Sequence, residues 1–176
     1  RVLAPGADGA DMVRLVEEER PFLFAGTTVF LGQASVERMA EVVAAVERVA
    51  ALPAWAERVL AWAPAAARHA TPAAGVFMGY DFHLGQEGPQ LIEINTNAGG
   101  GLLNAALAQA QFACCEEVAA ILPGVHPVPT LERDFVDMFR TEWRAERGDA
   151  ALGRIAIVDE NPLSQFLYPE FLLFRK

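Results

Sequence analysis

The sequence predicts an α/β protein of the α+β kind, in which an antiparallel hairpin packs with several helices. Two observations favour this class: residues 36–50 and 131–143 carry apolar side chains at helical spacing, whereas residues 76–95 hold two alternating strand patterns around a glycine-containing turn. The chain has 176 residues, of which 53% are hydrophobic. Because that composition can bury a core, we expect one or two small folded domains.

Helix and strand patterns also precede the hairpin. Residues 10–19 favour a short helix, and TTVFL at residues 27–31 has the β-branched and aromatic composition of a strand. Ser35 can N-cap the helix over residues 36–50. Pro53 suits the first turn of a further helix, because a proline at that position removes no intrahelical hydrogen bond.

The hairpin is predicted from VFMGYDFHL, GQEGP and QLIEIN, which read as strand, loop and strand. A five-residue loop, Gly85–Pro89, then sets the register of the two strands. In that register Asp81 lies opposite Glu93, and Asn95 lies opposite Gly79. Asp81, Glu93 and Asn95 therefore project together from one face.

Two carboxylates at this position predict a metal site. Directly opposed residues have Cβ atoms about 4.5–5.5 Å apart, and like charges at that distance destabilise the strand pair. A cation between Asp81 and Glu93 removes the conflict, and Mg²⁺ prefers carboxylate and amide oxygens such as those of Asp81, Glu93 and Asn95. The alternative is an exposed hairpin face whose acidic side chains are simply solvated.

A polar turn with three glycines follows Asn95 and precedes a helix predicted over residues 102–122. Backbone amides at a glycine turn and helix start can receive an anion, which makes Thr96, Asn97 and Gly99–Gly101 candidates for ligand binding. The alternative is a flexible loop that caps the helix, for which glycine and asparagine are common.

The last part of the chain predicts a second unit. The proline-rich connection PGVHPVPT suggests a boundary, so we divide the chain into parts 1–130 and 131–176. An amphipathic helix from Leu131, an apolar strand RIAIVD from Arg154 and a helix near Pro169 follow. Open α/β sheets bind ligands beyond the carboxyl ends of their strands, which makes Asp159, Glu160 and Asn161 candidate substrate-binding residues; a plain helix-entry turn is the alternative.

Charge and cysteine content exclude several classes. The net charge is −9, and the 14 basic residues are scattered, so we expect no nucleic-acid partner. No apolar stretch is long enough to span a membrane, and no signal peptide is recognisable. The adjacent Cys114 and Cys115 suggest a reducing, cytoplasmic compartment. The chain begins at Arg1 and stops within a helical pattern at Lys176, so we expect a fragment.

The stretch MGYDFHLGQEGPQLIEINTNAGGG resembles the metal-binding hairpin of circularly permuted ATP-grasp ligases, namely eukaryotic-type glutathione synthetase and bacterial glutathionylspermidine synthetase. The resemblance implies that Asp81, Glu93 and Asn95 hold Mg²⁺ against the phosphates of ATP. It implies ligand contacts for the turn, with Thr96 and Asn97 towards the substrate, and with Asn97, Gly99, Gly100 and Gly101 towards the nucleotide.

RIAIVDENPLSQFLYPEFLLF resembles the strand and helix that open the α/β substrate domain of the same family, which again points to Asp159, Glu160 and Asn161. The implied reaction joins a small-molecule acid to an amine through an acyl phosphate, and a homo-oligomer is compatible with it. The chain departs from the family in two ways. Gly79 stands where the family has an arginine, and no segment is a candidate for the ATP-clamping lobe with its phosphate-binding lysines, because Lys176 is the only lysine. We therefore expect this chain alone to be inactive.

Three other readings remain open to different degrees. A degenerate ATP-grasp relative that binds nucleotide or metal as a scaffold is the strongest, because of Gly79. A dinucleotide-binding dehydrogenase is disfavoured, since the glycine spacing reaches Asn104 and the preceding strand belongs to a hairpin. The third is a cysteine nucleophile with a histidine base, for which the residues available are Cys114, Cys115, His69, His83 and His126.

Overall fold

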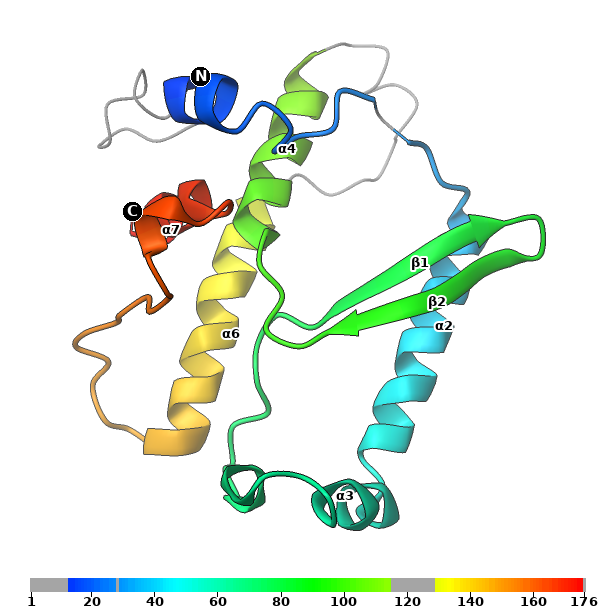
Figure 1. Ribbon diagram of the computed structural model, residues 1–176, viewed down its shortest axis with the longest axis vertical. Coiled ribbons are helices and arrows are strands. Elements are labelled where there is room, and N and C mark those ends of the chain that lie inside the picture. Colours follow the sequence, from blue (N-terminus) through cyan, green and yellow to red (C-terminus); the bar gives the residue numbers. More distant parts are fainter. Residues whose placement is uncertain (1–12, 28, 115–128, 176) are drawn as a thin grey trace. The chain divides into compact units, whose positions relative to one another are not determined.

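The computed structural model describes residues 13–27, 29–114 and 129–175. The chain divides into two compact units, of which unit 2 spans residues 28–97 and unit 1 comprises residues 1–27 and 98–176 (Figure 1). Helices together with a two-stranded antiparallel hairpin confirm the predicted α+β class. The division at residue 130 between a metal-binding part and a substrate domain is a functional one, and it stays a prediction.

Unit 2 places one long helix beside the hairpin, as the cyan ribbon and green arrows of Figure 1 illustrate. Pro53 stands in the first turn of its helix, as predicted. The elements of this unit are α2 (Gln33–Ala50), α3 (Pro53–Leu60), the 3₁₀ turn η2 (Ala65–Arg68), β1 (Gly79–Gly85) and β2 (Gly88–Asn95).

Two predictions before the hairpin are wrong. Ser35 is not the N-cap of α2, because the extended Gly32 holds that position and the Ser35 amide already donates to the Gly32 carbonyl at 2.9 Å. Residues 29–31 form no strand and are exposed. A strand composition without a neighbouring strand yields no ladder, and among the described residues only β1 and β2 pair.

The open end of the hairpin has the predicted register. Asp81 lies opposite Glu93. Asn95 lies opposite Gly79, one step further along the same face. The pairing that the metal hypothesis requires is therefore confirmed.

The closed end of the hairpin differs from the prediction. Gly85 pairs with Gly88, so the turn consists of Gln86 and Glu87 rather than of the five residues Gly85–Pro89. Gly88 has a φ of +94°, a left-handed conformation that a residue with a Cβ adopts only with strain. The tighter turn follows from this glycine, because its left-handed conformation lets the chain reverse within two residues instead of the predicted five.

A β-bulge in β2 reconciles the two ends of the hairpin. Pairing passes from Asp81 and Glu93 directly to Phe82 and Leu91, so Ile92 has no partner on β1. Ile92 is 67% exposed. Leu91 consequently shares the face of Phe82, whereas simple alternation had placed it on the face of Glu93.

Unit 1 packs α4 against both α6 and α7. The amphipathic helix expected from Leu131 and the helix expected near Pro169 are both confirmed. Part of the helix predicted over residues 102–122 is α4, and residues 115–122 lie outside the described residues. The elements are the π-helical turn η1 (Leu15–Glu19), α4 (Gly101–Cys114), α6 (Pro129–Arg147), the 3₁₀ turn η3 (Pro162–Ser164) and α7 (Tyr168–Phe174).

The strand predicted for RIAIVD is wrong. Residues 154–159 are irregular and exposed, with Val158 at 89%. An isolated strand leaves its backbone donors and acceptors without a ladder, and in the described part of the chain no strand lies beside this segment. The open α/β sheet expected at this point is therefore not formed by the residues that the structure describes.

The core of unit 1 combines apolar packing with two buried charges. Leu103, Ala105 and Pro169 are buried, and the Phe139 and Phe174 rings meet edge to face with centroids 6.0 Å apart. Arg20 and Glu170 are the buried charged residues among those described. A buried charge is tolerated only when it is well hydrogen-bonded, so both side chains have a structural task.

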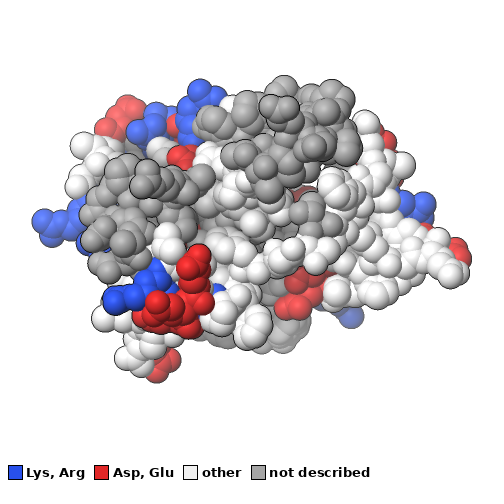
Figure 2. Space-filling view, turned by 90° about the horizontal axis from the view of Figure 1, so that it is seen from above, with Lys and Arg blue, Asp and Glu red and all other residues white. Residues whose placement is uncertain are grey.

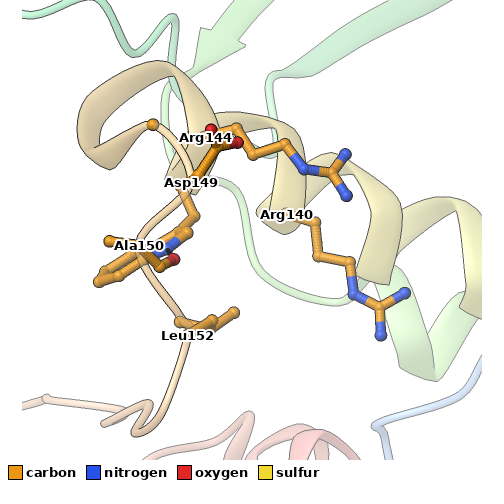
Figure 3. A pocket seen from close by; sticks show the side chains of 7 residues that line it. Arg140, Arg144, Asp149, Ala150 and Leu152 are labelled. Atoms are coloured by element: carbon orange, nitrogen blue, oxygen red, sulfur yellow. Dashed lines mark hydrogen bonds between the residues drawn. The ribbon is translucent and has the colours of Figure 1, made fainter.

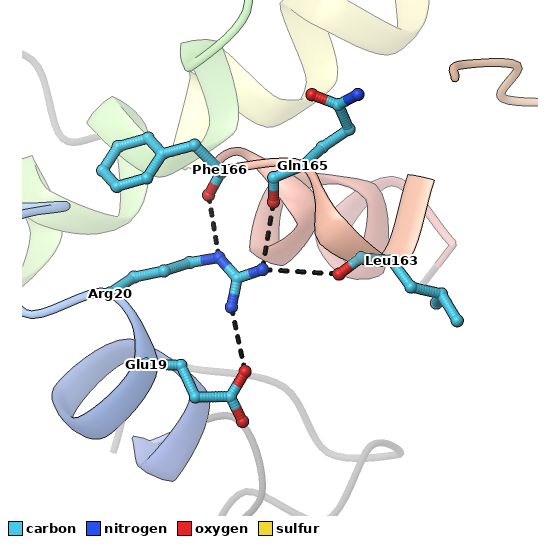
Figure 4. Close-up of polar contacts among 5 residues, drawn as sticks. All are labelled: Glu19, Arg20, Leu163, Gln165 and Phe166. Atoms are coloured by element: carbon cyan, nitrogen blue, oxygen red, sulfur yellow. Dashed lines mark hydrogen bonds and ion pairs between the residues drawn. The ribbon is translucent and has the colours of Figure 1, made fainter. Parts of the chain in front are cut away.

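Arg20 holds the segment that leads into α7 (Figure 4). Its guanidinium donates to the carbonyls of Phe166 and Gln165 at 3.0 Å each and to that of Leu163 at 3.4 Å. It also pairs with Glu19 at 3.2 Å. Four charge-assisted contacts fix this turn and hence the position from which α7 starts.

The outer surface agrees with an acidic chain. On the face in Figure 2, basic side chains lie in separate groups, with acidic side chains beside several of them. Among the described residues, no helix combines the length and the apolarity needed to cross a lipid bilayer.

Candidate metal centre

The hairpin has one face turned to α2 and one turned away. The Tyr80 hydroxyl donates to a carboxylate oxygen of Glu47 on α2, and the Arg38 side chain approaches Gly88. Because neighbouring side chains on a strand point to opposite faces, Asp81 lies on the face away from α2. The predicted metal-binding residues therefore occupy the open face of the sheet.

The three predicted metal-binding residues lie together. Asp81 is paired with Glu93, and the Asn95 amide nitrogen donates to Asp81 Oδ2 at 3.4 Å. Asp81 and Glu93 are exposed, whereas Asn95 is half-buried. The described residues contain no cluster of three or more histidines, cysteines or carboxylates, so the donor set consists of two carboxylates and one amide.

This donor set fits Mg²⁺ in kind and in number. Mg²⁺ takes few protein ligands, prefers hard oxygen donors and keeps several waters, which an exposed face allows. The Asn95 amide donates through its nitrogen in the present arrangement. Its oxygen is the group that binds a cation, so metal binding requires the amide to rotate and the Asp81 carboxylate to exchange one partner for another.

The β-bulge lies directly beside this pair. Ile92 interrupts the ladder next to Glu93, and bulges of this kind increase the local twist and re-aim neighbouring side chains. Sequence reasoning missed the bulge, because Ile92 fits the alternating pattern as well as any apolar residue. The tight turn at Gly88 is the signal that could have revealed it, since a two-residue turn and the pairing of Asp81 with Glu93 together require one extra residue.

The glycine turn after β2 already holds an anion, and that anion belongs to the protein. The Gly100 amide donates to Glu170 Oε2 at 2.6 Å, and the Leu102 amide donates to Glu170 Oε1 at 2.8 Å. Glu170 is 3% exposed. The physical expectation that these amides receive a negative charge is therefore met by a side chain 70 residues away along the chain.

Sequence reasoning missed Glu170 entirely. It lies in the first turn of α7, where an acidic residue is ordinary, and no local pattern connects it with Gly100. Of the other candidates in the turn, Thr96 and Asn97 are exposed, and Asn97 has a left-handed φ of +58°. A Cβ on Gly99 would lie 2.5 Å from Leu167 Cδ1, so the lack of a side chain there serves packing.

The predicted substrate-side loop forms a turn that enters η3. The Glu160 amide donates to Asp159 Oδ1 at 2.7 Å, and the Asn161 carbonyl accepts from the Ser164 amide at 2.9 Å. All three predicted residues, Asp159 to Asn161, are exposed, and Asn161 has a φ of +48°. This loop belongs to unit 1, and the Asp81 pair belongs to unit 2.

The residues of the cysteine nucleophile hypothesis are only partly described. His69 and His83 are exposed in unit 2. Cys115, His126 and the side chain of Cys114 lie outside the described residues. That hypothesis stays a prediction.

Two hollows lie in unit 1. An open pocket of about 230 Å³ at the end of α6 is lined by Arg140, Arg144 and Asp149 among others (Figure 3). The indole of Trp143, which also lines it, donates to the Ala150 carbonyl at 2.7 Å. The charges of this pocket are mixed, so no ligand class is favoured.

The second hollow, of about 320 Å³, adjoins the glycine turn. Its lining is mostly apolar and consists of Leu23, Phe24, Ala25, Gly100, Leu103, Asn104, Leu107, Phe166 and Leu167. Side chains of this kind suit an apolar group better than a charged one.

Comparison of the chain with protein-family models, with curated proteins and with solved structures gives no match in any of the three.

Proposed function

We propose that this chain is part of an ATP-dependent carboxylate–amine ligase of the circularly permuted ATP-grasp type, in which Asp81, Glu93 and Asn95 hold Mg²⁺. The observation that carries the proposal is the cross-strand pairing of Asp81 with Glu93, with the Asn95 amide 3.4 Å from Asp81. A cation relieves the repulsion between two carboxylates in this position, and the hard donors favour Mg²⁺.

In this reaction the metal would neutralise the phosphate charge of ATP and align it for attack by a substrate carboxylate. Phosphoryl transfer depends mainly on positioning and on charge neutralisation, so no protein nucleophile is needed. The two carboxylates bind the cation, the hairpin holds them at a constant spacing, and the exposed Thr96 and Asn97 are available to the ligand. The acyl phosphate that results would react with an amine to give an amide.

The first test is Mg²⁺ binding, measured by calorimetry and by the electron paramagnetic resonance of Mn²⁺ as a substitute. Wild-type protein should bind one ion at the hairpin, whereas Asp81→Asn and Glu93→Gln should each lose at least about ten-fold in affinity. Glu87→Gln is the matched control, because Glu87 is an exposed acid in the turn of the same hairpin. Equal affinity of Glu93→Gln and Glu87→Gln would reject the metal site.

The second test addresses the chemistry. In the full-length protein, hydroxylamine should trap an acyl phosphate as a hydroxamate when ATP, Mg²⁺ and a carboxylic acid substrate are present. Glu93→Gln should abolish the trapped product, and Glu87→Gln should not. Metal binding without hydroxamate across a panel of acids favours the scaffold alternative, in which the site binds metal or nucleotide without turnover.

A further inference from the structure

The β-bulge at Ile92 adds two side chains to the face that carries the predicted metal-binding residues. Gln90 and Glu93 are three residues apart, so simple alternation would turn them to opposite faces of β2. Because the ladder skips Ile92, Gln90 instead pairs with His83. His83 is two residues from Asp81 on β1 and shares its face, which is turned away from α2. The open face therefore holds a second cross-strand pair beside that of the two carboxylates.

The side chains of this second pair are accessible to a ligand. His83 and Gln90 are both exposed. A Cβ at Gly85 would lie 3.9 Å from His83 Cδ2, so the imidazole lies over the open face beside a residue that has no side chain. Within the described part of the chain, no hydrogen bond holds the imidazole or the Gln90 amide. Each of the two groups offers an N–H donor.

A phosphate group bound to the metal would need such donors. The two carboxylates already balance the charge of one Mg²⁺, so the negative charge of a phosphate on this ion stays uncompensated. Neither β1 nor β2 contains a lysine or an arginine. The side chains with N–H groups on this face are those of His83, Gln90 and Asn95, and Asn95 is the proposed metal ligand.

The spacing suits contact with a ligand of the metal better than contact with the metal itself. Residues two apart on a strand are separated by about 7 Å, whereas Mg²⁺ needs its donor atoms at about 2.1 Å. The described residues form no group of three histidines, cysteines or carboxylates that could hold an ion, so His83 does not complete such a group with Asp81 and Glu93. A phosphate on the ion has further oxygens that extend beyond it and that a donor one step along the strand can meet.

We propose that His83 and Gln90 donate hydrogen bonds to the phosphate groups of the nucleotide that the metal holds. This inference rests on the proposed function and extends it from the metal to the phosphate that the metal binds. It also gives the bulge at Ile92 a role, since simple alternation from Glu93 would turn Gln90 to the face of α2.

The test measures two affinities of the full-length protein: that for Mn²⁺ alone, by electron paramagnetic resonance, and that of the Mn²⁺-loaded protein for ATP, by calorimetry. His83→Leu and Gln90→Met should each lower the affinity for ATP at least about ten-fold, because a hydrogen bond to a charged group is lost. Neither substitution should change the affinity for Mn²⁺. His83→Asn keeps an N–H donor and should lose less affinity for ATP than His83→Leu. Gln86→Met is the matched control and should bind ATP like wild type, because Gln86 is an exposed glutamine in the turn of the same hairpin.

The two affinities separate the phosphate contact from the metal site. Unchanged ATP affinity in His83→Leu or in Gln90→Met, with Mn²⁺ binding intact, overturns the inference and leaves the metal site standing. A fall in the Mn²⁺ affinity of His83→Leu as large as that of Glu93→Gln would make His83 a metal ligand, which overturns the inference as well.

Pyrophosphate in place of ATP isolates the phosphate groups from the rest of the nucleotide. Both variants should lose affinity for pyrophosphate as they do for ATP, and a loss confined to ATP would assign the contacts to the nucleoside and overturn the inference. Wild-type protein that binds Mn²⁺ but neither ATP nor pyrophosphate also overturns it. Absence of Mn²⁺ binding by the wild-type protein rejects the metal site, and the inference with it.

Discussion

At the scale of single residues, the strongest physical statement concerns two like charges. Asp81 and Glu93 are cross-strand partners, and carboxylates in such a pair repel one another. In the absence of a cation the pair costs stability, which the backbone ladder and the packing of the opposite face must offset. A residue pair that opposes folding without a ligand and supports it with one is typical of a binding site.

This charge conflict predicts opposite effects of one substitution with and without metal. With a chelator present, Glu93→Gln should raise the melting temperature by about 1 °C, because the repulsion is gone. With Mg²⁺ at ten times the dissociation constant of the wild-type protein, the wild-type protein should gain about 1.4 kcal/mol of stability, and Glu93→Gln, whose affinity is at least about ten-fold lower, should gain no more than about 0.4 kcal/mol. Thermal denaturation with and without Mg²⁺ measures both effects. A lower melting temperature of Glu93→Gln in chelator would contradict the repulsion.

The hydrogen bond between Tyr80 and Glu47 predicts that the stability of unit 2 depends on pH. The hydrogen bond to Glu47, with burial and the Glu47 charge adding to it, raises the pKa of Tyr80 above its usual value of 10.0. A raised pKa means that the contact stabilises the fold fully below pH 10 and is lost as the pH rises through the raised pKa. The phenolate can no longer donate, and it repels the Glu47 carboxylate.

Absorbance at 295 nm measures this titration, and the chain has only two tyrosines. Tyr80→Phe should remove the component that titrates above pH 10, and Glu47→Gln should lower the midpoint of that component. Glu41→Gln, on the same helix, is the control and should leave the midpoint where it is. A midpoint that does not respond to Glu47→Gln would mean that the hydrogen bond is absent in solution.

At the scale of elements, the connection between the glycine turn and α7 depends on the absence of one side chain. Gly99→Ala should destabilise unit 1 by about 1–3 kcal/mol, since its Cβ would overlap Leu167 Cδ1 at 2.5 Å. Gly153→Ala should have little effect, because no atom lies within 4 Å of its Cβ position. Urea denaturation of the two variants measures the difference.

A second substitution tests whether steric overlap is the cause. Leu167→Ala removes the atom that collides, so the double variant Gly99→Ala, Leu167→Ala should be less destabilised than the sum of the two single variants. Additive losses would place the cost of Gly99→Ala elsewhere, for example in the backbone of the turn.

Local pattern sufficed for the elements whose partners are near in sequence. The hairpin, α6 and the start of α7 follow from alternation, from helical spacing and from a proline in the first turn. The pairing of Asp81 with Glu93 was also predictable, although the loop used to derive it was wrong and a bulge compensated for the error. The loop that we predicted is too long and shifts the register by one residue, and the bulge at Ile92 shifts it back by one residue. The two errors cancel, so the predicted register is correct at Asp81 and Glu93.

Contacts between distant segments were not predictable. The carboxylate that caps the glycine turn comes from Glu170, and the guanidinium that holds the entry to α7 comes from Arg20, 146 residues before its partner Phe166. Neither residue has a local signature. The strands predicted at residues 27–31 and 154–159 failed for a related reason: strand composition is a preference, and only a neighbouring strand converts it into a ladder.

At the scale of the whole molecule, the segment after α6 presents exposed apolar side chains. Ile155 is 73% exposed and Val158 is 89% exposed, and both lie in an irregular segment outside any ladder. Exposed apolar side chains that gather in one segment favour contact with another chain. This surface predicts self-association of the protein at sufficient concentration.

Analytical ultracentrifugation over a concentration series tests this prediction. The mean mass of wild-type protein should rise with concentration, and the double variant Ile155→Lys, Val158→Lys should remain at the mass of one chain, because the added charges repel and remove apolar surface. Arg154→Gln, which changes the charge of the segment and keeps its apolar residues, should associate like wild type. Equal association of the double variant and wild type would assign the interface to another surface. Concentration-independent mass of all three proteins would mean that these side chains are too few to offset the entropy lost on association.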